Sequence, residues 1–164
     1  MKKLQTEIIN DRLVTGQYGN IRFGQWGFEC SDRQSFLTLT DQCRDAYQNG
    51  DYWQLAEGDW ALDYHARQTD PHTLHIRATL AALRDGLLQD AVIRLVFDKS
   101  AIQTGEIAGR KFRHTNSDRY RLYPVHIARL TGTDGTIISV TLDRYDGAGR
   151  FTPYLYLRDS GDHW

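Results

Sequence analysis

Two turn signals near the C-terminus constrain the fold of this chain most strongly. Thr133-Asp134-Gly135-Thr136 and the stretch Asp146–Gly149 both contain the Asp and Gly residues that reverse a β-strand. Each signal lies between runs rich in the β-branched and aromatic residues that strands favour. The spacing therefore predicts a three-stranded β-meander over residues 119–158.

The turns also predict the register of the meander. Closure at the first turn sets Ile127 opposite Leu142, and closure at the second sets Leu142 opposite Pro153. Both registers give the same apolar face, formed by Val125, Ile127, Val140, Leu142, Phe151, Pro153 and Leu155. The opposite face is polar and aromatic, and it carries His126, Ser139, Thr141, Asp143, Thr152, Tyr154 and Tyr156.

Strand patterns also dominate the rest of the chain. Residues 3–9 and 12–18 are predicted to be short strands around the Asn10-Asp11 turn. Residues 60–67 alternate between apolar and polar side chains, as expected for a half-buried strand, and residues 91–97 form a β-branched run. These patterns predict antiparallel sheets.

One segment has the signals of a helix. Ser31 and Gln34 form a capping-box pattern, and Asn49-Gly50 is a plausible end. Apolar residues then recur at helical spacing, namely Phe36, Leu39, Cys43 and Tyr47. The alternative is a strand at 35–39 followed by a shorter helix, because Thr38 is β-branched.

Residues 72–88 fit two structures. The favoured one is a strand that turns at Asp85-Gly86, since Asp-Gly is a strong hairpin signal. The alternative is a helix that starts at Asp70-Pro71. Together the patterns predict an α+β, strand-rich fold: a curved antiparallel or barrel-like sheet with one main helix and the C-terminal meander.

Composition limits the class of protein. The chain has 164 residues, of which 40% are hydrophobic and 25% charged, which suits a single globular domain over residues 1–164. The net charge of −1 gives no overall field that would attract nucleic acid or an acidic membrane. No run approaches the roughly 20 apolar residues that span a bilayer. We therefore expect no membrane partner.

The cysteines and the N-terminal residues favour the cytoplasm. Cys30 and Cys43 form no CxxC pair, and Glu7 and Asp11 interrupt any signal-peptide core. No metal-ligand signature and no cofactor motif occurs, so neither a metal nor a cofactor is predicted.

The polar face of the meander is the first candidate site. Its register sets His126 opposite Asp143, and a His–Asp pair is half of a catalytic triad. Tyr154 and Tyr156 lie on the same face and suit ligand contacts. No nucleophile elbow accompanies the pair, and the alternative is an ordinary surface ion pair.

The second candidate lies on the hairpin that residues 60–67 and 73–80 are expected to form. His65 and Arg67 would lie beside His75 and Arg77. Arginines beside the histidines repel a metal ion, so the cluster favours a carboxylate or phosphate if the face lines a cavity. Otherwise it is a solvated sheet face.

The third candidate is the basic segment 110–121. It interleaves positive charge with aromatic residues, a pattern that single-stranded nucleic acids and phosphorylated ligands bind. Its basic residues are Arg110, Lys111, Arg113, Arg119 and Arg121.

Three functions fit these patterns. The first is a non-catalytic binding module for a small molecule or a protein partner. The second is a phospholigand or single-stranded nucleic-acid binder that uses the 110–121 segment. The third is a small hydrolase or isomerase that uses His126 with Asp143. The sequence favours the first, which needs the fewest assumptions, and it specifies no oligomeric state.

Overall fold

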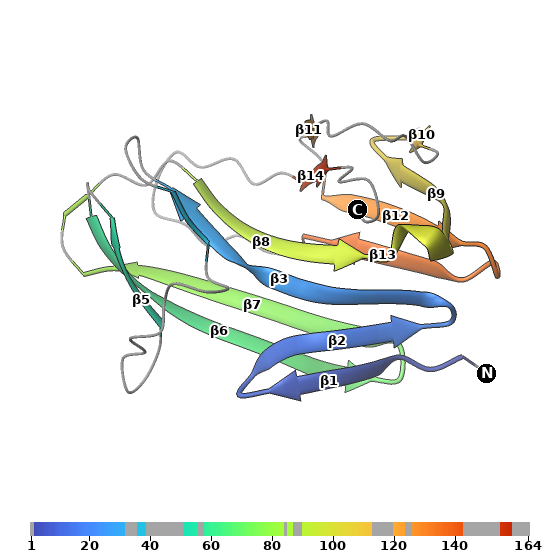
Figure 1. Ribbon diagram of the computed structural model, residues 1–164, viewed down its shortest axis with the longest axis horizontal. Coiled ribbons are helices and arrows are strands. Elements are labelled where there is room, and N and C mark those ends of the chain that lie inside the picture. Colours follow the sequence, from blue (N-terminus) through green and yellow to red (C-terminus); the bar gives the residue numbers. More distant parts are fainter. Residues whose placement is uncertain are drawn as a thin grey trace. The chain divides into compact units, whose positions relative to one another are not determined.

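The computed structural model describes residues 2–31, 36–38, 51–55, 58–83, 85–86, 90–112, 120–123, 126–142 and 155–158. These residues form strands and one short 3₁₀ helix, η1 (Lys99–Ala101), and they contain no α-helix (Figure 1). The strands pair in four sheets instead of one curved or barrel-like sheet. The prediction of antiparallel sheets is confirmed, and the prediction of an α+β fold with one main helix is wrong.

A five-stranded sheet contains most of the N-terminal strands. Its order is β1-β2-β3-β4, with β8 also paired to β3. The strands are β1 (Gln5–Ile9), β2 (Arg12–Tyr18), β3 (Ile21–Ser31), β4 (Phe36–Thr38) and β8 (Asp90–Phe97). Asn10 and Asp11 have φ values of 49° and 61°, the left-handed conformation that a two-residue type I′ turn needs. The predicted β1–β2 hairpin is confirmed.

A three-stranded sheet follows in the order β5-β6-β7. Its strands are β5 (Asp51–Leu55), β6 (Gly58–Asp70) and β7 (Thr73–Ala82), the last two forming the long green hairpin of Figure 1. The strand favoured for residues 72–88 is therefore confirmed for the part that β7 covers. The backbone N–H of His72 donates to Asp70 Oδ1 at 2.7 Å, which stabilises the turn between β6 and β7.

The C-terminal strands belong to two further sheets. A four-stranded sheet has the order β10-β9-β12-β13, with β9 (Ile102–Ile107), β10 (Arg110–Phe112), β12 (Ile127–Gly132) and β13 (Ile137–Thr141). A two-stranded sheet pairs β11 (Tyr120–Tyr123) with β14 (Leu155–Arg158). The first hairpin of the predicted meander is confirmed as β12–β13, but the third strand is wrong, because β14 pairs with β11 and not with β13 in the described structure.

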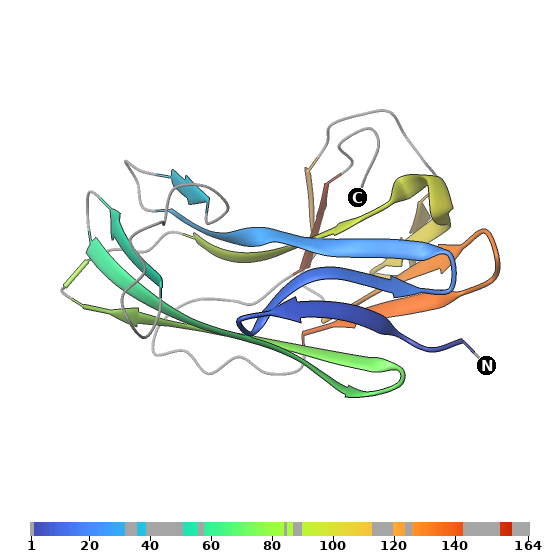
Figure 2. The same cartoon turned by 60° about the horizontal axis from the view of Figure 1, so that its bottom comes forward.

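The register of the β12–β13 hairpin also differs from the prediction by one residue. Ile127 lies opposite Thr141, not opposite Leu142. Gly135 N–H donates to Gly132 O at 3.0 Å, and Gly132 N–H donates to Thr136 O at 2.7 Å. Gly135 has φ of 77°, so the loop consists of residues 133–135 and ends with a left-handed glycine. The hairpin is shown in orange in Figure 2.

The segment predicted to start the main helix is extended. Ser31 is the last residue of β3 and lies opposite Phe36 of β4, so it does not cap a helix. The alternative strand at 35–39 agrees with β4 for Phe36–Thr38. Residues 39–50, where the remaining helical positions fall, lie outside the described residues.

The chain divides into two compact units. The first unit contains Met1–Lys3, Gln17–Phe23 and Phe97–Trp164. The second unit contains Leu4–Gly16 and Gly24–Val96. The single domain expected over the whole chain stays a prediction.

Each unit has its own apolar core. In the first unit Ile21 is fully buried and the rings of Phe23 and Phe97 lie 5.6 Å apart. The other buried apolar residues of this unit are Ala101, Ile102, Ile107 and Leu130. In the second unit the buried residues are Leu4, Leu13, Leu62, Tyr64 and Ala66. Both cores follow from strand alternation, which turns every second side chain inward.

Candidate functional site

The β6–β7 hairpin separates an apolar face from a charged face. Leu62, Tyr64 and Ala66 of β6 are buried, whereas Asp63 and the residues that alternate with them are exposed. The exposed side chains of this face are Asp63, His65 and Arg67 on β6 and His75, Arg77 and Thr79 on β7. The hairpin thus presents a charged surface to solvent.

The register brings four of the predicted site residues together. His65 lies opposite Arg77, and Arg67 lies opposite His75. We call these four residues the basic face. Directly opposite side chains in an antiparallel pair have Cβ atoms roughly 4.5–5.5 Å apart, and diagonal neighbours roughly 7–8 Å. All four side chains can therefore contact one ligand.

His65 differs from the other three because it contacts two acids. Its Nδ1 lies 3.0 Å from Asp11 Oδ2, and its Nε2 lies 3.0 Å from Asp63 Oδ1. A neutral imidazole donates through one nitrogen only, so both contacts become hydrogen bonds when the ring is protonated. Within the described part of the chain, no acidic side chain lies within ion-pair distance of Arg67, His75 or Arg77.

Asp11 is the member of this cluster that sequence reasoning missed. It belongs to the β1–β2 turn, and its carbonyl accepts the Ala66 backbone N–H at 2.7 Å. The same edge is fixed by Leu4, whose N–H donates to Pro71 O at 2.7 Å, and by Thr6, whose hydroxyl donates to Gln68 Oε1 at 2.7 Å. No local pattern in the sequence indicates that a turn residue reaches β6.

The polar face predicted for the meander is not assembled in the described structure. His126 is exposed, and it lies opposite Leu142, whose N–H donates to the His126 carbonyl at 2.8 Å. The His126 Nδ1 lies 3.2 Å from Leu142 O. Tyr156 is on β14, opposite Leu122 of β11, and thus on a different sheet. Asp143 and Tyr154 lie outside the described residues.

The 110–121 segment is divided between two sheets. Arg110 and Lys111 are exposed on β10, where Lys111 lies opposite Glu106. Arg121 is on β11, which pairs with β14. Arg113 and Arg119 lie outside the described residues. The described residues of the segment therefore belong to two different strands.

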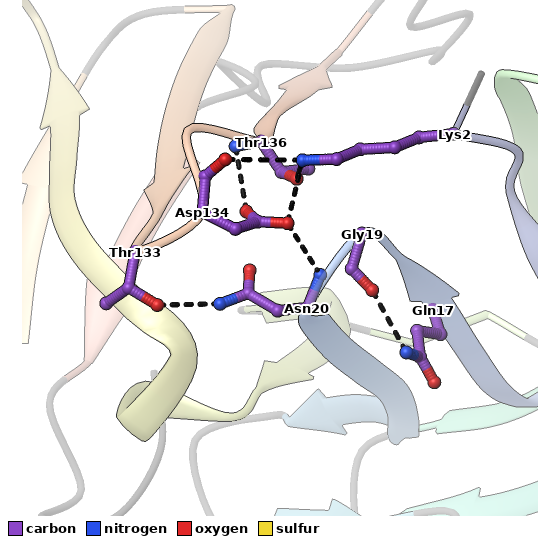
Figure 3. A network of polar contacts seen from close by, with 7 residues as sticks. All are labelled: Lys2, Gln17, Gly19, Asn20, Thr133, Asp134 and Thr136. Carbon is purple, nitrogen blue, oxygen red and sulfur yellow. Dashed lines mark hydrogen bonds and ion pairs between the residues drawn. The ribbon is translucent and has the colours of Figure 1, made fainter.

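A second polar cluster lies in the first unit, and its residues form hydrogen bonds with one another (Figure 3). The Lys2 ammonium donates to Asp134 Oδ2 at 2.7 Å, to Thr136 Oγ1 at 2.6 Å and to Asp134 O at 3.3 Å. Asn20 donates its backbone N–H to Asp134 Oδ2 at 3.3 Å and its side-chain N–H to Thr133 Oγ1 at 2.6 Å. We call these five residues the Lys2 network.

The Lys2 network changes the acidity of its carboxylate. Hydrogen bonds from the Lys2 side chain and from the side chain and backbone of Thr136 hold the pKa of Asp134 well below its usual value. The ammonium and the carboxylate satisfy each other, and Thr136 is buried beside them. The cluster therefore connects the N-terminal residues to the β12–β13 turn, and it offers a ligand no free charge.

The described residues contain neither a metal-ligand cluster nor a membrane-spanning helix. No group of three His, Cys, Asp or Glu side chains there can hold a metal ion. In the Asp11–His65–Asp63 trio the ring lies between the acids, each of which contacts a different nitrogen. No helix in the described part of the chain is long and apolar enough to cross a membrane.

Comparisons with protein-family models, with curated proteins and with solved structures found no match to this chain. The function is therefore inferred from the geometry of its residues.

Proposed function

We propose that this protein is a non-catalytic binding module whose basic face binds an acidic segment of a protein partner. The observation that carries the proposal is the grouping of Arg67, His75 and Arg77, three exposed side chains, none of which has a described acidic side chain within ion-pair distance. The cytoplasmic location expected from the sequence belongs to this proposal.

Electrostatics favours an anionic occupant. Arg67 and Arg77 are diagonal neighbours across the β6–β7 ladder, so their two positive charges lie on the same face. Each guanidinium can hold a carboxylate of an acidic segment in a bidentate contact. A free carboxylate partner is therefore better accommodated here than on a surface whose cations are already paired.

The shape of the face favours a protein over a small molecule. Small ligands bind mainly in concave, largely apolar sites. The basic face is one side of a hairpin and is open to solvent. An extended acidic segment can follow the strands and contact several cations at once.

The chemistry of the face favours a protein over single-stranded nucleic acid. Nucleic-acid grooves combine cations with aromatic side chains on which bases stack. Among the described side chains of β6 and β7, those next to the basic face include Asp63 and Thr79, neither of which is aromatic. The phosphate-binding alternative therefore rests on Arg110 and Lys111 of β10 and not on β6–β7.

The test uses a fluorescein-labelled octaglutamate peptide and measures its anisotropy on titration with the full chain. We expect saturable binding at low salt that weakens as ionic strength rises, because exposed ion pairs are screened. The double substitution Arg67→Gln/Arg77→Gln should weaken binding about fivefold or more. Unchanged binding by this variant would exclude the basic face.

Two matched measurements separate the alternatives. The double substitution Arg110→Gln/Lys111→Gln removes two exposed cations from β10 and should leave octaglutamate binding intact. If a labelled oligothymidylate binds instead and this β10 variant abolishes it, the phospholigand function is correct. Any turnover abolished by Asp143→Asn would support the hydrolase or isomerase function.

A further inference from the structure

Among the described strands, β13 lies at one edge of the four-stranded sheet, and it has few of the features that prevent an edge strand from pairing with another chain. Among the described strands it pairs with β12 alone. Its residues Ile137–Thr141 contain no charge and no proline, and the Ile137 residue is 57% exposed. The opposite edge of the same sheet, β10, carries Arg110 and Lys111 instead. Charged residues of this kind normally protect edges against pairing with another chain.

Two backbone hydrogen bonds determine which groups of β13 point outward. Leu142 N–H donates to His126 O, and Gly132 N–H donates to Thr136 O, so both are hydrogen-bonded pairs of the ladder. In an antiparallel ladder such pairs recur at every second residue. The intervening residues direct their N–H and C=O groups to the open edge, and these are Ile137, Ser139 and Thr141.

We propose that two copies of this chain associate through β13 about a two-fold axis at Ser139. This register sets Ser139 opposite Ser139 of the partner subunit, and Ile137 opposite Thr141 of the partner subunit. Each of these pairs joins outward-facing backbone groups on both sides, and each can form two ladder hydrogen bonds. A symmetric closed pair is also the commonest oligomer of soluble proteins.

The side chains of the exposed face fit this register. Ile127 lies opposite Thr141, and Thr131 lies opposite Ile137, within the hairpin. The two-fold pairing extends these rows across the interface, so each row alternates isoleucine and threonine. Such β-branched neighbours stabilise antiparallel pairs.

Charge does not oppose the pairing. Arg129 lies opposite Ser139 and contacts Glu106 at 3.8 Å, on the side of β12 away from β13. The two arginines of a dimer would be separated by both β13 strands, at a strand spacing of roughly 4.8 Å each. A second copy is therefore the occupant that the edge fits, in both its backbone groups and its charge.

Sedimentation velocity of the full chain over a range of concentrations tests the proposal. We expect a concentration-dependent dimer. Ser139→Pro removes an N–H that points away from β12, so it leaves the β12–β13 ladder in place and blocks the edge. It should raise the dimer dissociation constant at least about tenfold. Ser139→Ala keeps the N–H and should leave the constant unchanged.

A second substitution keeps the test decisive if the proline variant does not fold. Ile137→Lys places a charge on the same edge without changing the backbone, and it should also yield monomers. Circular dichroism verifies that each variant is folded. A wild-type chain that is monomeric at all concentrations, or a dimer that persists in the folded variants, would overturn the proposal.

Discussion

The Lys2 network pairs its one cation with oxygen acceptors, whereas the two arginines of the basic face form no ion pair with a described acid. The Lys2 ammonium contacts two oxygens of Asp134 and the Thr136 hydroxyl, within 3.3 Å. Arg67 and Arg77 have no acidic side chain within ion-pair distance among the described residues, although Asp63 lies on the same face. The charge of Lys2 is therefore used within the fold, whereas the charges of Arg67 and Arg77 are available to a partner.

The largest expected effect comes from substituting Gly19, which lies close to two residues of the Lys2 network. Gly19 has φ of 60°, and a Cβ there would overlap Thr136 Oγ1 and lie 2.8 Å from Asp134 Oδ2. Gly19→Ala should therefore lower the free energy of unfolding by about 2–4 kcal/mol, measured by urea denaturation. The loss combines left-handed strain with displacement of the network.

Gly109→Ala is the matched control for that substitution. Gly109 has φ of 71°, but no atom lies within 4 Å of the position that a Cβ would take. Only the left-handed strain remains, so the loss should be about 1–2 kcal/mol. Equal losses at the two glycines would mean that the close approach at Gly19 does not contribute to stability.

The next effect is the acid sensitivity of the network. The pKa of Asp134 is lowered mainly by the hydrogen bond from Lys2. A carboxyl with a lowered folded pKa adds stability above its unfolded pKa of about 3.9, and that stability is lost as pH falls further. Asp134→Asn should therefore destabilise the protein at pH 7 and flatten the stability decline below about pH 4.

Asp70 provides the comparison for this pH dependence. Its pKa is also lowered, mainly by the backbone N–H of His72, but no ammonium takes part. Salt should therefore reduce the effect of Asp134→Asn more than that of Asp70→Asn, as judged by urea midpoints. Equal salt dependence would show that the Lys2 ion pair is unimportant.

Local turn chemistry accounts for what the sequence predicts correctly. Asn10 and Asp11 tolerate the left-handed conformation, so the β1–β2 hairpin follows from two residues. The 60–67 alternation predicts both faces of β6, because Leu62 is buried and His65 exposed. The His65–Arg77 and Arg67–His75 pairs then follow from the short connection between β6 and β7.

The register of β12–β13 differs by one residue from the register that the sequence predicts. A two-residue loop needs a left-handed conformation at both Asp134 and Gly135, whereas of these two only Gly135 has a positive φ, so the loop has three residues. A shift of one residue moves a strand's side chains to the other face. Ile127 is consequently exposed, and His126 lies opposite Leu142.

The remaining errors concern partners that are distant in sequence. Phe36–Thr38 extends because the end of β3 offers it a ladder, which a capping pattern at Ser31 cannot reveal. β14 pairs with β11 and not with β13, and this pairing likewise depends on strands that are distant in sequence and not on a local turn. Tertiary context overrides propensity in both places.

A smaller effect concerns the buried side of β6, opposite the basic face. The Tyr64 hydroxyl is buried and has no hydrogen-bond partner among the described residues, and burial raises the pKa of Tyr64. Tyr64→Phe should leave the free energy of unfolding unchanged or raise it by up to about 1 kcal/mol. A clear loss of stability would mean that the hydroxyl has a partner.

The same substitution should change alkaline stability. Because burial disfavours the charged phenolate of Tyr64, the stability of the folded state should decline as pH rises above the unfolded pKa of about 10. Tyr64→Phe removes that decline, which urea midpoints at pH 9 and above can measure. An identical alkaline decline in both proteins would contradict this assignment.

The smallest expected effects concern the arginines of the basic face, and they test directly whether the charges of this face stabilise the fold. Arg67→Gln and Arg77→Gln should each change the free energy of unfolding by no more than about 0.5 kcal/mol, because neither guanidinium has an acidic partner in the described chain. Lys2→Gln should cost more stability, since it leaves the Asp134 carboxylate without its ammonium. If the arginine variants lose as much stability as Lys2→Gln, the basic face holds the fold together. If they keep their stability and lose octaglutamate binding, those charges serve a partner, because removing them affects recognition without affecting folding.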